Sequence, residues 1–180
     1  MKKLTILLVA TTLALAPAAF AANNTQSQTN TLSVAVAAEA DLTITSASTT
    51  TLSSNSSVAF SPYAGTTTFS YHIRTSQSGG TGSLTVQVTS DFSPSGGPSA
   101  ASVTDPLTIT CGAVTTNASS ACSGSPAVNT SGTTQVINFG ANARSAKTGD
   151  SSSVSWSLVN DPQYPTNTYT ATATFTISAA

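Results

Sequence analysis

The chain has 180 residues, of which 39% are hydrophobic and only 6% are charged, and its formal net charge at pH 7 is −1. So few basic residues exclude the electrostatic attraction by which proteins hold nucleic acid or anionic membrane surfaces. The 30 serines and 33 threonines make up about a third of the chain. Because apolar residues recur among them in regular alternation, we predict a folded domain rather than a disordered chain.

The first 21 residues have the features of a cleaved signal peptide. Lys2 and Lys3 give a positive start, residues 4–15 are mostly apolar, and residues 19–21 (AFA) match a small-x-small cleavage site. The apolar run is short for a transmembrane helix, and no second run is long enough. We therefore predict a mature chain that begins at residue 22, does not insert into a membrane and is secreted, periplasmic or attached to the cell surface. An uncleaved membrane anchor is the alternative.

Residues 22–30 are polar and lack periodicity, which predicts a flexible leader followed by a single domain at 31–180. The domain opens with an alternating segment, Thr31–Ala37, whose apolar members are Leu32, Val34 and Val36. We expect this segment to be the domain's own first strand. Because it lies near a terminus behind a flexible leader, it is also a candidate donor strand for a neighbouring copy of the chain.

Further strands are predicted wherever apolar and polar residues alternate with a period of two. They lie at residues 42–44, 58–60, 67–74, 84–88, 107–111, 135–139, 154–158 and 167–177. Glycines in segment 78–82 supply the positive φ of a tight turn, so strands 67–74 and 84–88 are predicted to pair as a hairpin. Residues 91–106 and 112–134 are predicted loops.

The last predicted strand alternates most strictly. Its apolar members are Tyr169, Ala171, Ala173, Phe175 and Ile177, and threonines occupy the positions between them. We predict that this strand buries the apolar set and exposes the threonines. We also predict interior neighbours for it, because a long exposed edge strand promotes aggregation. The two alanines are expected to leave room for Trp156 on the opposing sheet.

Eight or nine short strands, separated by turn residues and without a helix after the signal peptide, predict an all-β fold. The expected architecture is an antiparallel immunoglobulin-like β-sandwich. In such a fold each sheet buries one face and exposes the other to water, which matches the alternation. Trp156 alternates with Val154 and Leu158 and is therefore predicted to lie in the core.

Cys111 and Cys122 are the only cysteines. In an exported chain such an even pair predicts a structural disulfide, which here closes a short loop. A metal or redox pair is the alternative, but neither a CxxC spacing nor a nearby histidine supports it.

No constellation of reactive residues predicts catalysis. His72 is the only histidine, and it falls on the polar face of a predicted strand together with Arg74. The mature chain has three bases against six acids, and most of the acids lie near turns, where Asp commonly caps the backbone. No G-x-S-x-G motif, phosphate-binding loop or acidic calcium loop occurs. We therefore predict a protein without enzymatic activity, cofactor or metal.

Two tyrosines, Tyr63 and Tyr164, fall in predicted turns. Aromatic rings in such positions can stack on the apolar faces of sugars. They are the candidate ligand contacts if the protein binds carbohydrate.

Two stretches resemble a group of uncharacterised secreted bacterial proteins with Ser/Thr-rich β-sandwich chains. They are SYHIRTSQSGGTGSLTVQVTSDF and SVSWSLVNDPQYPTNTYTATATFTIS. More loosely, the TYTATATFTIS ending is similar to the closing strands of fimbrial and spore-coat-U-type subunits and of WxL domains. Trp156-Ser157-Leu158 spells W-x-L, although no second such motif follows. The resemblance implies export and a sandwich fold, and it implies no known activity.

Together these features favour an exported, non-enzymatic structural or adhesive surface protein, such as a pilus-like subunit whose partners are copies of itself. The alternative is an extracellular carbohydrate-binding module that binds surface polysaccharide. A hydrolase on the same scaffold has the least support.

Overall fold

The computed structural model describes residues 27–180, and within this range it contains eight β-strands and no helix. In chain order they are β1 (Glu39–Ile44), β2 (Tyr63–Arg74), β3 (Gly82–Ser93), β4 (Thr108–Cys111), β5 (Ser119–Ala121), β6 (Thr134–Phe139), β7 (Asp150–Leu158) and β8 (Thr170–Ala179). The chain divides into two units, Met1–Val34 and Ala35–Ala180, and the second contains every one of these strands. The predicted signal peptide lies outside the described residues, as does the first part of the predicted leader.

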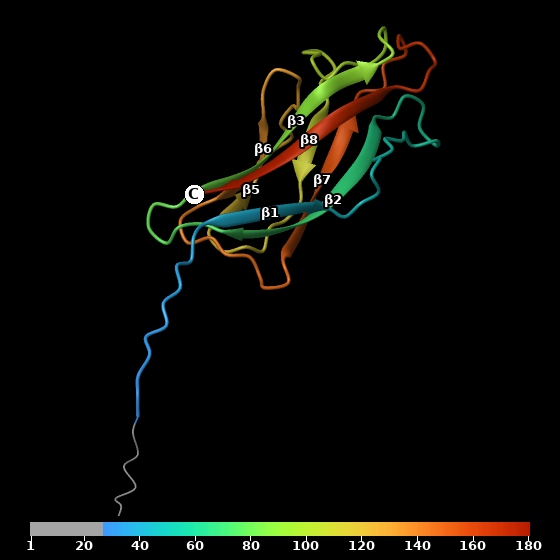
Figure 1. The fold of residues 1–180 in the computed structure, drawn as a ribbon. Coiled ribbons are helices and arrows are strands. Elements are labelled where there is room, and N and C mark those ends of the chain that lie inside the picture. Colours follow the sequence, from blue (N-terminus) through green and yellow to red (C-terminus); the bar gives the residue numbers. More distant parts are fainter. Residues whose placement is uncertain (1–26) are drawn as a thin grey trace, which may run out of the picture. The chain divides into compact units, whose positions relative to one another are not determined.

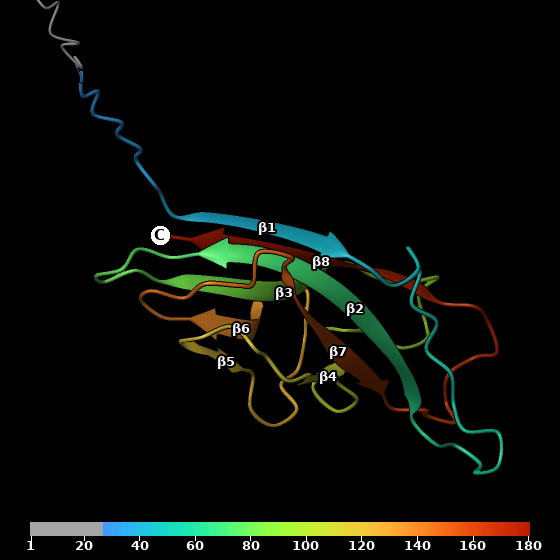
Figure 2. The same ribbon diagram turned by 90° about the horizontal axis from the view of Figure 1, so that it is seen from below.

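The strands form two four-stranded sheets in which all pairs are antiparallel. One sheet has the order β1-β2-β7-β4, and the other has the order β5-β6-β3-β8. The sheets face each other, with β1 and β2 in one layer and β8 and β3 in the other (Figure 1, Figure 2). The predicted all-β antiparallel fold of about eight strands is confirmed.

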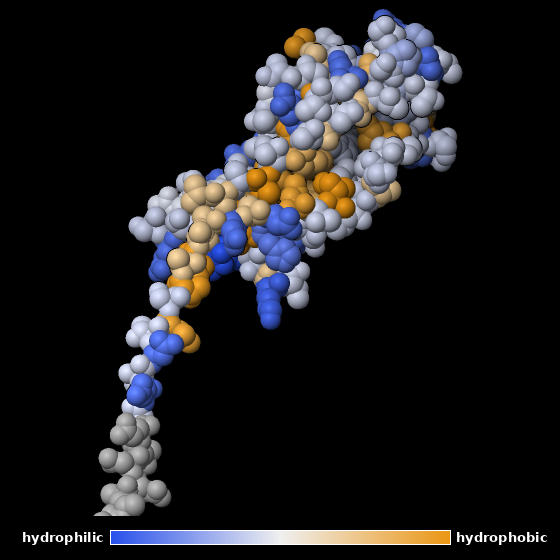
Figure 3. All heavy atoms as spheres, viewed as in Figure 1, coloured by the Kyte–Doolittle hydropathy of each residue, from blue (hydrophilic) through white to orange (hydrophobic). Residues whose placement is uncertain are grey.

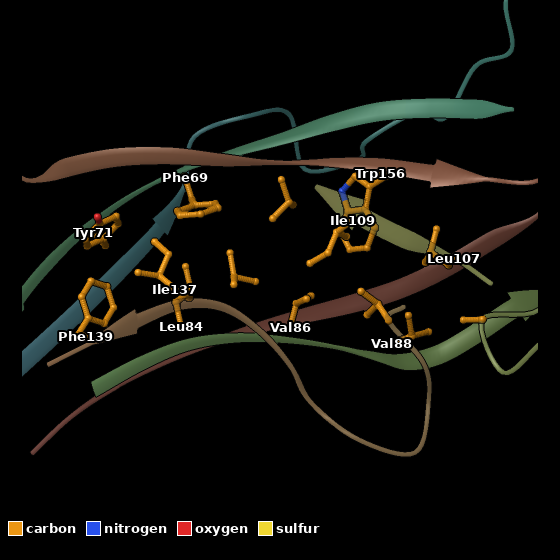
Figure 4. Close-up of a cluster of buried hydrophobic side chains, with 14 of the residues drawn as sticks. Phe69, Tyr71, Leu84, Val86, Val88, Leu107, Ile109, Ile137, Phe139 and Trp156 are labelled. Carbon is orange, nitrogen blue, oxygen red and sulfur yellow. The ribbon is translucent and has the colours of Figure 1, made fainter. Parts of the chain in front are cut away.

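The core lies between the sheets, and inward side chains from both layers point toward one another (Figure 4). Its main members are Phe69, Tyr71, Ile109, Val154 and Trp156 from one sheet and Leu84, Val86, Val88, Ile137 and Phe139 from the other. Aromatic rings meet across the layers, with 5.5 Å between the centroids of Tyr71 and Phe139 and 6.2 Å between those of Trp156 and Phe175. The prediction of Trp156 as a core residue is confirmed. On the last strand its aromatic neighbour is Phe175.

Polar groups in this core are hydrogen-bonded, as buried polar groups must be. The Trp156 indole Nε1 donates to Thr67 Oγ1 at 2.9 Å. The Tyr71 hydroxyl and Thr116 Oγ1 lie 2.9 Å apart, and Thr116 in turn donates to the Asp150 carboxylate. Burial raises the pKa of Tyr71; the bond to Thr116 lowers this pKa, and the Asp150 charge raises it further.

The predicted hairpin between β2 and β3 is wrong. β2 pairs with β1 and β7, whereas β3 pairs with β6 and β8 in the other sheet. The connection at 75–81 crosses between the layers, where Thr75 N donates to Ala143 O at 3.0 Å and Ser76 N donates to Ala180 O at 3.1 Å. Stacked sheets lie about 10 Å apart, which a connection of this length can span. The crossing lets the apolar faces of both strands meet in one core.

Backbone pairing also shifts several boundaries from the predicted ones. β7 begins at Asp150 rather than at residue 154, because its first residues pair with β2. β5 lies within the predicted loop 112–134, because it pairs with β6. The predicted strand at 58–60 is a turn instead, and there Val58 and Phe60 are exposed.

Asp91 closes the loop that follows β3. Its carboxylate accepts hydrogen bonds from Phe92 N at 2.8 Å, Ala100 N at 2.7 Å and Ser99 Oγ at 2.6 Å. Burial pushes the pKa of Asp91 up, but the three hydrogen bonds outweigh it and lower the pKa below its ordinary value. The predicted role of Asp as a local backbone cap is confirmed at this position.

The two long sides of the paired layers are closed differently. On one side, the edge strands β4 and β5 are joined by the predicted disulfide, with 5.6 Å between the Cα atoms of Cys111 and Cys122. Residues 126–128 also cover the outer edge of β4, where Ile109 N donates to Pro126 O at 3.0 Å. On the other side, the edge strands β1 and β8 contact each other without a covalent link (Figure 2).

Replacing both Cys111 and Cys122 by serine should lower the free energy of unfolding by about 2–3 kcal/mol, on the chain-entropy estimate for a loop this short. Urea denaturation followed by the fluorescence of Trp156 measures the change. The double variant leaves no unpaired thiol. An unchanged unfolding free energy would show that residues 126–128 close this side without the disulfide.

Candidate functional site

Three large aliphatic side chains in segment 31–37 are exposed to water. The exposed fractions are 89% for Leu32, 83% for Val34 and 64% for Val36. None of the residues 27–38 belongs to a strand, so the prediction that this segment is the domain's own first strand is wrong. The first strand is β1, which begins at Glu39. The segment therefore has the side-chain alternation of a strand but pairs with no strand among residues 27–180, and its use as a donor strand stays a prediction.

Arg74 holds the backbone just before β1. Its Nε donates to Ala37 O at 2.7 Å, and its Nη2 donates to Glu39 Oε2 at 2.5 Å. Glu39 and Arg74 are directly opposite in the β1–β2 ladder, and so are Asp41 and His72, with 3.9 Å between Asp41 Oδ2 and His72 Nδ1. Oppositely charged residues in such positions stabilise a strand pair by about 0.2–1 kcal/mol each. The two pairs thus fix the register of the edge strand β1.

A shallow hollow of about 440 Å³ lies beside these pairs. Its charged or titratable lining residues are Glu39, Asp41, His72, Arg74 and Arg144. In the described part of the chain Arg144 has no acidic partner, and no serine hydroxyl bonds to His72. No group of three His, Cys, Asp or Glu side chains that could hold a metal occurs among residues 27–180. The charges here mostly pair with one another across β1 and β2.

β8 forms a free edge of the second sheet. It pairs with β3 alone, so the predicted interior position is wrong. Its threonines are exposed as predicted, but Ala171 and Ala173 are exposed as well, and only Phe175, Ile177 and Ala179 pack against the core. β1 lies beside the C-terminal half of β8 and ends at Ile44 (Figure 1, Figure 2). The N-terminal half of β8 therefore lacks a covering strand.

Charge and length distinguish β8 from the other edge strands. β4 is covered by residues 126–128, and β5 has only three residues. β1 carries Glu39 and Asp41, whereas β8 carries no charged residue and no proline. Natural sheet edges commonly carry such residues to prevent pairing with other chains. Figure 3 shows apolar side chains gathered between β1 and β8. Ile44, the last residue of β1, is 39% exposed.

The two candidate ligand tyrosines lie on separate segments. Tyr63 begins β2 and packs against the core, whereas Tyr164 lies in the connection between β7 and β8. Burial raises the pKa of Tyr164, and the carboxylates of Asp105 and Asp161 raise it further. Their rings do not form an aromatic pair with each other within residues 27–180. Carbohydrate binding through them stays a prediction.

The sequence singles out segment 31–37 by its alternation, but it does not reveal that this segment is unpaired or which features surround it. The charged pairs depend on the β1–β2 register, and the alternation in β1 could have placed Glu39 and Asp41 on one face. The free edge of β8 depends on sheet order, for which the sequence of β8 carries no local signal.

Comparisons with known protein families, with curated proteins and with solved structures give no match for this chain. Residues 27–180 contain no helix that is long and apolar enough to cross a membrane.

Replacing Arg74 by alanine should speed hydrogen exchange at the start of β1, because both the bond to Ala37 and the ion pair with Glu39 are lost. Replacing Glu39 by glutamine removes the ion pair and leaves the bond to Ala37, so it should have a smaller effect. Exchange followed by mass spectrometry measures both variants. Equal exchange rates for the two would show that the bond to Ala37 does not order the chain.

Proposed function

We propose that this chain is an exported, non-enzymatic structural protein of the cell surface whose copies associate by strand addition, as a pilus-like or adhesive subunit. The proposal includes cleavage of a signal peptide after residue 21 and an immunoglobulin-like β-sandwich as the mature domain. Segment 31–37 is the donor strand.

The observation that carries this proposal is the exposure of Leu32, Val34 and Val36 at alternate positions. A segment with strand periodicity, no charge and no proline can extend the edge of another sheet. In that mode the backbone supplies affinity through a hydrogen-bond ladder, while alternate side chains enter apolar sites. The same three side chains gain nothing from remaining in water.

Magnitudes favour strand pairing over a loose hydrophobic contact. Burial of each aliphatic side chain contributes about 1.5–3 kcal/mol. Association costs about 4–15 kcal/mol in lost translational and rotational freedom. Three such side chains together contribute about 4.5–9 kcal/mol, which meets the lower part of this range but not its upper part. A ladder of backbone hydrogen bonds, each with a net contribution of about 1 kcal/mol, supplies the remainder.

Two further features support export and a role without catalysis. The Cys111–Cys122 disulfide suits an oxidising compartment outside the cytoplasm. The single histidine lies beside Asp41 on an exposed strand face, where it helps to pair β1 with β2. These features are those of a durable scaffold with few reactive groups.

The triple substitution Leu32→Ser, Val34→Ser and Val36→Ser should convert assembled protein into monomers. It removes the apolar set of the donor while leaving the strands of residues 39–180 unchanged. Sedimentation velocity of the processed chain, residues 22–180, over a range of concentrations measures the assembly state.

The matched control is Thr31→Ser, Ser33→Thr and Ala35→Ser, which changes the other face of the same segment and should leave assembly intact. Circular dichroism should show the same β-content for both variants. If a chain lacking residues 22–38 assembles as the full processed chain does, or if the processed chain is monomeric throughout, the proposal is wrong.

A further inference from the structure

We propose that the acceptor for segment 31–37 is the free edge of β8 on a second copy of the chain. The donor becomes a fifth strand of that copy's second sheet. This inference rests on the proposed function, because it names the surface that receives the same donor segment.

The backbone of β8 can receive such a strand. β8 is ten residues long and forms its ladder with β3 on one side only. Its other side therefore presents backbone N–H and C=O groups without a strand partner among residues 27–180, and β1 does not lie beside its N-terminal half. A long edge without charge or proline is the kind of edge to which other strands add.

The inward face of β8 is uncovered where a donor would lie. Ala171 and Ala173 point to this face and are exposed, while Phe175 and Ile177 on the same face are half-buried. Because strand side chains alternate, an added strand can present all its large apolar side chains on this one face. The alanines are small enough to leave room for Leu32, Val34 and Val36 beside them.

β1 is the less suitable acceptor on this side of the molecule. It is six residues long, and its residues Glu39 and Asp41 are charged. Their carboxylates are already engaged with Arg74 and His72 on β2. The inward face of β1 has three apolar residues, Ala40, Leu42 and Ile44, whereas that of β8 has five.

The backbone between segment 31–37 and β1 is held in place. Arg74 holds Ala37 O at 2.7 Å, and β1 begins at Glu39. Ala38 alone lies between these two residues. We assign the donor on β8 to another copy of the chain.

Cysteine cross-linking between two singly substituted chains tests this assignment. Cys111 and Cys122 form a disulfide, so residues 27–180 contain no free thiol that would compete in the reaction. A Val34→Cys chain is mixed with an Ala173→Cys or an Ala171→Cys chain and oxidised gently. We expect heterodimers from at least one of these mixtures, because neighbouring residues on one face of paired strands approach to disulfide distance. Thr172→Cys, on the opposite face of β8, is the matched control and should cross-link severalfold less.

Ala173→Asp gives an independent readout in the otherwise unchanged processed chain. It places a charge on an exposed residue, so the monomer should fold as before and its assembly should be lost, whereas Thr172→Asp should still assemble. One outcome would refute β8 as the acceptor and still support segment 31–37 as the donor. In that outcome the triple serine variant of segment 31–37 is monomeric, Ala173→Asp assembles normally, and neither alanine position cross-links. A concentration-independent link within one Val34→Cys/Ala173→Cys monomer would also overturn the assignment of the acceptor. If the donor variants themselves assemble normally, the proposed function fails as well.

Discussion

The fold depends on one shared apolar layer between two sheets, and its two long sides are enclosed unequally. At the β4–β5 side, the disulfide and residues 126–128 hold the edges together. At the β1–β8 side, one short strand lies beside one long strand, and part of the inward face of β8 is exposed. The hydrophobic effect favours covering that face. The same chain carries an apolar segment without a partner.

This asymmetry links packing to function. A strand that adds to β8 would extend the second sheet and cover side chains that the domain itself leaves exposed. The charge distribution is consistent with that outcome, because the charged residues of this region gather on the outer face of β1 and β2 and leave β8 uncharged. Arg74 contacts the chain at the start of β1, where it donates hydrogen bonds to the Glu39 carboxylate and to Ala37 O. Arg74 thus holds the backbone directly before β1.

Local patterns in the sequence were enough to predict most strands, the disulfide, the core position of Trp156 and the backbone-capping role of Asp91. These features depend on side-chain alternation, on cysteine pairing and on turn chemistry, all of which act over a few residues. Sheet partners depend on contacts between distant segments. Glycines at 79, 80 and 82 fit a hairpin as well as they fit the observed crossing between layers. Apolar and polar residues alternate equally regularly in β8 and in segment 31–37. Among residues 27–180, however, β8 pairs on one side, with β3, whereas segment 31–37 pairs with no strand.

Hydrogen exchange on the processed chain, compared between dilute monomer and assembled protein, tests the central claim most directly. The open edge predicts rapid exchange in the monomer both for residues 31–37 and for the outward amides of β8. Assembly should then protect these two segments together, while the β4–β5 side remains unchanged. Protection of the β8 edge already in the dilute monomer, or assembly without added protection in β8, would contradict the account.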